Sequence, residues 1–236
     1  MIRTNEFQTF RLTFQEVCPP IAEIRTFLQS DNLGEEHPVN IFITDILPSL
    51  NDNSGITGSY IIKELQTIDI SSGNITVENT TLYAGKQVCG YLKNATHIAL
   101  FLCTAGNLYT KLSAELNQRS DFMESFIVDA IGSLTVEKAM DYIQQNLSNT
   151  LLSKNIRITN RYSPGYCNWP LTGQQDLFRL IGTNPTSILL SESSLMNPVK
   201  SVSGIIGIGT EVKQQGYRCN TCRDINCIYR KILGEK

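Results

Sequence analysis

A nearly continuous apolar run occupies residues 97–103 and ends at the small and polar residues of positions 104–107. A run of this length without polar alternation is typical of a strand that is buried on both faces. Such a strand needs a sheet that other elements cover above and below. The sequence therefore predicts a layered chain built around a central strand at residues 97–103.

Helical and extended patterns alternate along the rest of the chain. The longest helical pattern covers residues 121–149, where Phe126, Ile131 and Leu134 lie on one apolar stripe. Gly132 within it indicates either a bend or a close contact with another helix. Further helices are expected at residues 19–29, 84–92 and 174–181, and further strands at residues 9–14, 60–70, 80–83, 156–159, 187–191 and 201–208.

Charge and hydropathy exclude several classes of protein. The 236 residues include 20 Lys and Arg against 22 Asp and Glu. The net charge of −2 therefore gives no broad positive potential that would attract nucleic acid. No apolar run reaches the roughly 18 residues of a membrane helix, and the first residues lack the apolar stretch of a secretory signal. We expect a cytoplasmic protein that binds neither nucleic acid nor membrane.

Composition also divides the chain. Residues 30–58 are rich in Asp, Asn, Gly and Pro, so residues 1–58 are expected to form a small N-terminal αβ appendage. Residues 59–210 carry most of the periodic segments and are expected to form the core domain. Residues 211–236 form a cysteine-rich C-terminal tail.

The most unusual local string begins at Arg161 and reads Arg-Tyr-Ser-Pro-Gly-Tyr. An arginine can hold a carboxylate through two parallel N–H bonds, and a glycine lets the backbone approach a ligand closely. A tyrosine ring can stack on a flat group. The string therefore suits a loop around a small ligand, although an ordinary strand-to-helix connection has a similar composition.

Four segments extend this signal in chain order. They are residues 98–106, residues 129–137 (Asp-Ala-Ile-Gly-Ser-Leu-Thr-Val-Glu), residues 161–181 (beginning Arg-Tyr-Ser-Pro-Gly-Tyr-Cys-Asn-Trp-Pro-Leu-Thr-Gly-Gln-Gln) and residues 191–204 (Ser-Glu-Ser-Ser-Leu-Met-Asn-Pro-Val-Lys-Ser-Val-Ser-Gly). In this order they resemble the activation domain of cobalamin-dependent methionine synthase. We therefore expect an α+β fold like that domain, with a mixed, mostly antiparallel, curved sheet flanked by helices.

The resemblance implies a function in methionine biosynthesis. A domain of this family binds S-adenosylmethionine and supports reductive methylation of Co(II) cobalamin, with an electron from a flavodoxin-like donor. This chain has no segment that resembles the cobalamin, homocysteine or folate modules of the large synthase. It is therefore expected to be a stand-alone reactivation component, without turnover alone, whose methionine synthase or other corrinoid partner holds the cobalamin.

The resemblance also assigns site residues. Arg161 corresponds to the family's carboxylate clamp, and Ser163, Gly165 and Tyr166 correspond to backbone and ring contacts. Glu137 matches an acidic residue on the long helix that meets the amino or ribose groups. These are expected cofactor-binding residues, and no catalytic side chain is expected. Charge supports the assignment, because a zwitterion with an added sulfonium needs both a cation and acidic groups.

Three cysteines near the C-terminus have the spacing of metal ligands. Cys219, Cys222 and Cys227 include a Cys-x-x-Cys pair that can bring two sulfurs to one centre, and Cys167 is a candidate fourth ligand. An iron–sulfur cluster, structural zinc and reduced metal-free thiols all fit this pattern.

Two other functions fit the same residues. A binding module for a corrinoid protein would keep the fold without S-adenosylmethionine. An iron–sulfur redox activator of another corrinoid methyltransferase would use the cysteines for electron transfer. Trp169, inside the loop that begins at Arg161, fits either packing or stacking on a corrin.

Overall fold

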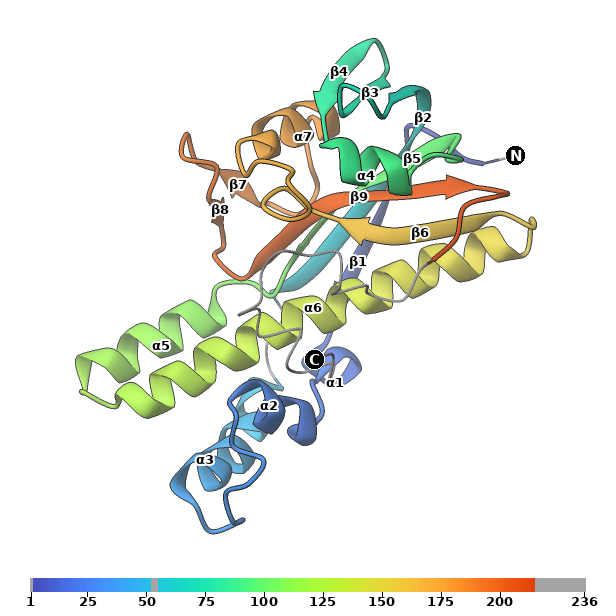
Figure 1. The fold of residues 1–236 in the computed structure, drawn as a ribbon. Helices are drawn as coiled ribbons and strands as arrows, with labels where there is room; N and C mark the ends of the chain where they lie inside the picture. The colour runs from blue at the N-terminus through green and yellow to red at the C-terminus, as the bar shows by residue number, and fades with distance from the viewer. Residues whose placement is uncertain (1, 52–54, 215–236) are drawn as a thin grey trace.

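The computed structural model describes residues 2–51 and 55–214, which form one seven-stranded sheet, a small two-stranded sheet and several helices (Figure 1). The main sheet has the strand order β4-β3-β2-β5-β9-β6, with β1 paired to β2 off this path, and every pairing in it is antiparallel. Its strands are β1 (Phe7–Leu12), β2 (Ile56–Asp69), β3 (Asn74–Val77), β4 (Thr80–Tyr83), β5 (His97–Thr104), β6 (Arg157–Tyr162) and β9 (Ser201–Gly209). The two-stranded sheet pairs β7 (Leu189–Leu190) with β8 (Met196–Asn197).

The central strand β5 lies between β2 and β9 and is buried from Ile98 to its end. Its side chains alternate between two apolar cores, because successive residues of a strand point to opposite faces. Phe101 and Cys103 pack into the core on the α6 side, whereas Leu100 and Leu102 pack into the core that contains Trp169. The prediction of a strand covered on both faces is confirmed.

A long helix, α6 (Phe122–Leu152), crosses one face of the sheet (Figure 1). Its inner side packs into the first core, the one that contains Phe101 and Cys103. Its 31 residues make it about 46 Å long. The helix α5 (Leu108–Gln118) packs against its first half. A Cβ atom on Gly132 of α6 would lie 2.6 Å from Cγ of Tyr109 on α5, so the glycine serves close helix contact.

The remaining helices form two groups, one packed on α6 and one on the opposite face of the sheet. On the α6 side, α1 (Phe14–Val17), α2 (Ile21–Phe27) and α3 (Pro38–Ile46) pack against α6, and a short 3-10 turn η1 (Leu47–Leu50) follows. On the opposite side, α4 (Lys86–Tyr91) and α7 (Gly173–Ile181) lie over β3, β4 and β9 (Figure 1). In the described part of the chain, no helix has both the length and the apolarity to cross a membrane.

The expected α+β fold is confirmed, with a sheet that is antiparallel throughout rather than mixed, but three helices differ from expectation. Phe14, expected at the end of a strand, begins α1. Residues 38–46 form α3 in a region with loop-like composition, where Pro38 occupies the first helical turn and His37 caps it. The helix α5 was not predicted at all. The boundaries at residues 58 and 210 stay predictions; β2 begins at Ile56 and β9 ends at Gly209.

Candidate functional site

Arg161 reaches the α6 side of the sheet because of an irregularity in the edge strand β6. Ile158 pairs with Ile208 and Arg161 pairs with Ile206, so three steps along β6 match two steps along β9. This extra residue is a β-bulge, and the Thr159 hydroxyl accepts the Gly207 N–H at 2.9 Å beside it. The bulge puts Arg161 on the same face as Ile158, three residues earlier.

The next residue of β6 confirms this alternation. Tyr162 faces the opposite side, where its ring stacks on Tyr91 of α4 at a centroid distance of 5.3 Å and an interplanar angle of 11°. The end of β6 is therefore fixed on both faces, by an aromatic pair on one side and by the arginine on the other.

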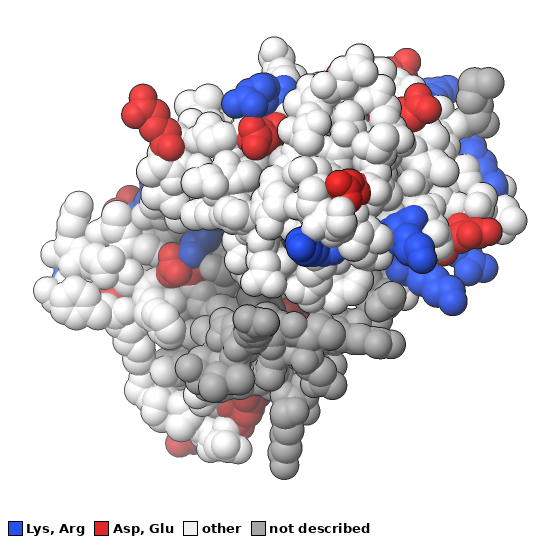
Figure 2. Space-filling view, turned by 45° about the horizontal axis from the view of Figure 1, so that its top comes forward, with Lys and Arg blue, Asp and Glu red and all other residues white. Residues whose placement is uncertain are grey.

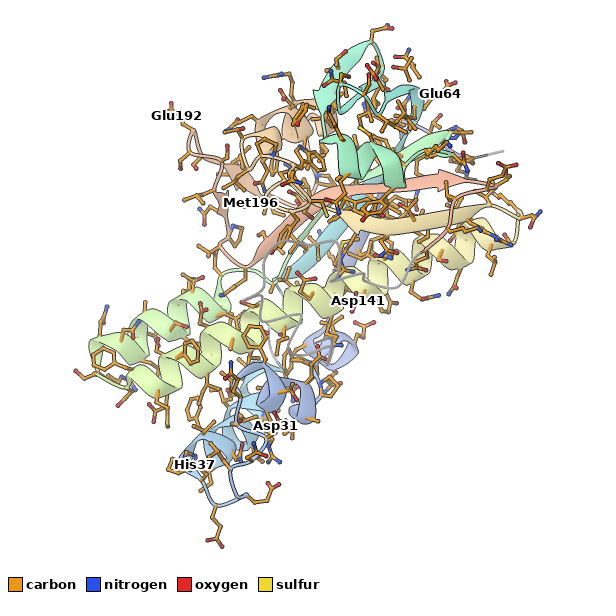
Figure 3. All side chains as sticks on the ribbon, viewed as in Figure 1. Asp31, His37, Glu64, Asp141, Glu192 and Met196 are labelled. Atoms are coloured by element: carbon orange, nitrogen blue, oxygen red, sulfur yellow. The ribbon has the colours of Figure 1, made fainter. Side chains whose placement is uncertain are left out.

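Three side chains of α6 hold the Arg161 guanidinium. Nη2 donates to Oε2 of Glu137 at 2.6 Å, and Nη1 donates to Oδ1 of Asp141 at 2.6 Å and to Oε1 of Gln144 at 3.2 Å. Residues 137, 141 and 144 are spaced by four and three positions, so they lie on one face of the helix. We call Arg161, Glu137, Asp141 and Gln144 the Arg161 cluster. Asp141 lies on the middle part of α6, below β6 in the view of Figure 3.

Partial burial strengthens the ion pairs of the cluster. The Arg161 side chain is 14% exposed, Glu137 29% and Asp141 54%. Charged hydrogen bonds gain strength as water is excluded, so the Glu137 pair is better shielded than the Asp141 pair. The cluster holds one positive and two negative side chains and has a net charge of −1.

Cys103 lies beneath this cluster, in the core on the α6 side. Burial, with a smaller contribution from Glu137, raises the pKa of its thiol to about 12, and Arg161 opposes the rise. The thiol is therefore protonated near neutral pH and is a packing residue, since only a thiolate is an effective nucleophile or metal ligand.

Ser163 shares the α6 side of the sheet with Arg161. A Cβ atom on Gly204 of β9 would lie 2.2 Å from the Tyr162 carbonyl oxygen and 2.9 Å from the Ser163 hydroxyl oxygen. A residue with a side chain at position 204 would push the end of β6 away. The glycine therefore lets Ser163 settle directly on β9, close to Arg161.

The loop at residues 163–172 folds back on itself after Ser163. Gly165 has a φ of +96° and donates its N–H to the Trp169 carbonyl at 2.7 Å, and the Tyr166 N–H donates to the Ser163 carbonyl at 3.2 Å. Tyr166 is 61% exposed, whereas Trp169 is 1% exposed. Trp169 is therefore a packing residue of the second core and is covered from any flat ligand outside.

The structure thus brings together two of the expected ligand-binding residues, Arg161 and Glu137, and sets Ser163 on the same face. Gly165 and Tyr166 lie in the adjoining loop, and their contacts with a ligand stay predictions. Sequence reasoning missed Asp141 and Gln144. Their signal was present, because they follow Glu137 at helical spacing, but nothing in the sequence pointed that face of the helix at Arg161.

A second ion pair joins α6 to the sheet two turns before Glu137. Lys200 Nζ lies 2.7 Å from Asp129 Oδ1 and donates to the Ser133 hydroxyl at 3.0 Å.

Elsewhere on the molecule, the described part of the face shown in Figure 2 carries acidic and basic side chains interspersed, with most of its surface uncharged.

The expected metal ligands are divided between described and other residues. Cys167 is half-buried in the loop at residues 163–172, with a φ of +52°. Cys219, Cys222 and Cys227 lie outside the described residues. Within residues 2–51 and 55–214, no three His, Cys, Asp or Glu side chains are grouped so as to hold a metal ion.

Comparisons with known proteins agree with this fold. The family described as "Vitamin B12 dependent methionine synthase, activation domain" matches residues 88–224, more than half of the 236 residues. A search of curated proteins finds no match. Among solved structures, the chain is similar to "Crystal Structure of the MetH Reactivation Domain bound to AdoHcy", with a TM-score of 0.62 and 16% identity over 91% of this chain and 81% of that one.

The family match covers α6, β6, the loop at residues 163–172 and β9, and so includes every residue of the Arg161 cluster. The chain therefore belongs to the family of vitamin B12 dependent methionine synthase activation domains.

Proposed function

We propose that this chain binds S-adenosylmethionine at the Arg161 cluster and supports reductive methylation of Co(II) cobalamin held by a separate methionine synthase or other corrinoid protein. The observation that carries the proposal is the position of Arg161. Its guanidinium is held at 2.6 Å from two carboxylates of α6, directly before the loop at residues 163–172.

The charges of the cluster fit those of the ligand. S-adenosylmethionine carries a carboxylate, an ammonium and a sulfonium, which sum to +1. The side chains of Arg161, Glu137 and Asp141 sum to −1, so the complex is neutral. A ligand that replaces the ion pair between Arg161 and Glu137 gives Arg161 a new anion and Glu137 a new cation, so neither charge is left unpaired at a half-buried site.

Each residue then has a defined task. Arg161 would bind the ligand carboxylate by two parallel N–H bonds, and Glu137 would accept a hydrogen bond from the ligand ammonium. Ser163 and the backbone near Gly165 would contact the nucleoside, and the exposed ring of Tyr166 would cover it. The bound S-adenosylmethionine supplies the methyl group, and a flavodoxin-like donor supplies the electron that the cobalt needs. The residues of this chain bind and orient the ligand and perform no acid–base step.

The similar solved structure is consistent with this proposal, since it is described as a reactivation domain bound to AdoHcy, S-adenosylhomocysteine. AdoHcy is the demethylated form of the same ligand and keeps the carboxylate and the ammonium. A methyl group that leaves this site needs an acceptor. In the proposal, that acceptor is cobalamin bound to a second polypeptide.

Calorimetric titration with S-adenosylmethionine tests the proposal directly. We expect saturable one-to-one binding to the purified chain, and reactivation of a Co(II)-inactivated methionine synthase when the chain, a reduced flavodoxin and the ligand are added together. Absence of binding at millimolar ligand would refute the proposed site. Binding without reactivation of any cobalamin-dependent methionine synthase would refute the proposed partner.

A further inference from the structure

The Arg161 guanidinium is held at two separate nitrogen atoms. Nη2 bonds to Glu137, whereas Nη1 bonds to Asp141 and Gln144. The two sets of partners therefore occupy different N–H groups. Glu137 can leave Nη2 while Asp141 and Gln144 keep their bonds to Nη1.

We propose that Asp141, assisted by Gln144, is the positioning residue that keeps Arg161 aimed while Glu137 gives way to the ligand carboxylate. This inference rests on the proposed function, because it concerns the same site. Asp141 acts on the ligand through Arg161 and does not contact it.

The geometry of α6 assigns the two carboxylates different tasks. Glu137 is 29% exposed and Asp141 is 54% exposed, one helical turn further along. A ligand that carries its own ammonium offers Glu137 a new partner. The ligand offers Asp141 no new partner. Gln144, three positions after Asp141 on the helix, bonds to the same nitrogen and helps to keep that nitrogen in place.

A second carboxylate partner for Arg161 reduces two free-energy costs of ligand binding. An arginine side chain has many rotamers, so fixing it only when the ligand arrives lowers the affinity. In addition, the Arg161 side chain is only 14% exposed, and a largely buried cation that loses its carboxylate partner pays a desolvation cost. Asp141 lowers the rotamer cost and the desolvation cost, because it keeps Nη1 paired while the ligand carboxylate replaces Glu137.

We expect the chain to fold without this carboxylate. The helix α6 is anchored by Met140, Ile143 and Leu147, which are fully or almost fully buried, and β6 is held by its pairing with β9. Removal of a half-exposed carboxylate should therefore change ligand affinity without unfolding the chain.

The test compares Asp141→Asn with the unaltered chain by calorimetric titration with S-adenosylmethionine and with S-adenosylhomocysteine. We expect a loss of affinity of about threefold to tenfold for both ligands, since both carry the carboxylate. S-adenosylhomocysteine has no net charge, so general attraction to an anion at position 141 contributes little. Methylthioadenosine lacks the carboxylate and should bind both proteins equally.

The matched control is Asp129→Asn. Asp129 lies on the same helix, has the same 54% exposure and is also paired with a cation at 2.7 Å. This substitution removes the same charge without touching Arg161, and it should leave the affinity within about twofold of the unaltered chain.

A double substitution separates positioning from direct contact. In an Arg161→Ala background, Asp141→Asn should have no further effect, because the residue through which it acts is gone. An equal loss in both backgrounds would mean that Asp141 binds the ligand itself, and it would overturn the inference. Unchanged affinity in the single variant would overturn it as well.

If Asp141→Asn does not fold, as judged by thermal unfolding, Gln144→Leu replaces it, with an expected loss of about twofold to fivefold that also disappears without Arg161. If the unaltered chain binds neither ligand, the proposed function fails and the inference fails with it. Binding that is intact but insensitive to position 141 refutes the inference alone.

Discussion

Arg161 Nη2 lies 2.6 Å from Oε2 of Glu137, so the two residues expected at opposite ends of a bound amino acid are in contact with each other. The cation and the anion satisfy one another in the ligand-free chain. A zwitterionic ligand must therefore replace this ion pair, and its affinity reports the difference between two sets of charged hydrogen bonds.

Replacement of Arg161 by alanine should weaken S-adenosylmethionine binding by about tenfold to a hundredfold, because the carboxylate loses a bidentate partner. Calorimetric titration measures this loss. Arg179→Ala is a suitable control, since Arg179 is 70% exposed and paired with Asp176 on α7. Equal affinities of the unaltered chain and a folded Arg161→Ala variant would show that the carboxylate binds elsewhere.

Glu137→Gln keeps the shape of the side chain and removes its charge. The ligand brings two positive charges and one negative, so the lost attraction exceeds the gain from a released guanidinium. We expect about tenfold weaker binding of S-adenosylmethionine and a smaller loss for S-adenosylhomocysteine, which lacks the sulfonium. A stronger complex with S-adenosylmethionine would mean that Glu137 only competes with the ligand for Arg161.

Gly132→Ala should destabilise the chain by about 1–3 kcal/mol, because the new methyl group would lie 2.6 Å from the Tyr109 ring. Urea unfolding measures the change. Gly90→Ala in α4 provides the contrast, since a Cβ atom there has no neighbour within 4 Å. Alanine at that position should be neutral or stabilising. Equal effects at the two positions would argue against tight packing of α5 on α6.

Cys103 should resist alkylation in the native chain, because burial raises the pKa of its thiol to about 12. The pKa of this thiol is about 8.5 in an unfolded chain, so its contribution to stability is complete below that pH and is lost as the pH rises toward 12. Mass spectrometry after iodoacetamide treatment at pH 8 should find Cys103 unmodified and the exposed Cys18 modified. Rapid labelling of Cys103 without unfolding would contradict its buried position.

If the C-terminal cysteines bind a metal, Cys219→Ser or Cys222→Ser should lower the metal content of the anaerobically purified chain. Iron with sulfide and a broad absorption would indicate a cluster, whereas zinc without colour would indicate a structural site. Cys89→Ser serves as the control, because Cys89 is buried in the second core. Equal metal content in all variants would exclude these cysteines as ligands.

The sequence predicted the elements whose patterns are strong in themselves. The apolar run of β5 and the long stripe of α6 are local signals, so both were found with boundaries within a few residues. The helix α5 was missed because polar residues dominate it, although Leu108, Leu112 and Leu116 recur at helical spacing and pack on the core.

The site was only half predictable for a different reason. Family resemblance pointed to Arg161 and Glu137, which are 24 positions apart in the chain, but their contact depends on how α6 crosses the end of β6. Asp141 carried no motif of its own. Its part in the cluster follows from tertiary packing, which no local pattern encodes.

The bulge in β6 has a consequence for comparing relatives. Without the bulge, regular alternation over the three steps from Ile158 to Arg161 would turn the arginine toward the α4 side, where Tyr162 now stacks on Tyr91. A relative can therefore keep every residue of the Arg-Tyr-Ser-Pro-Gly-Tyr string and still present the wrong side chain to the long helix. In this family, the presence of a bulge before the arginine is therefore as informative as the arginine itself.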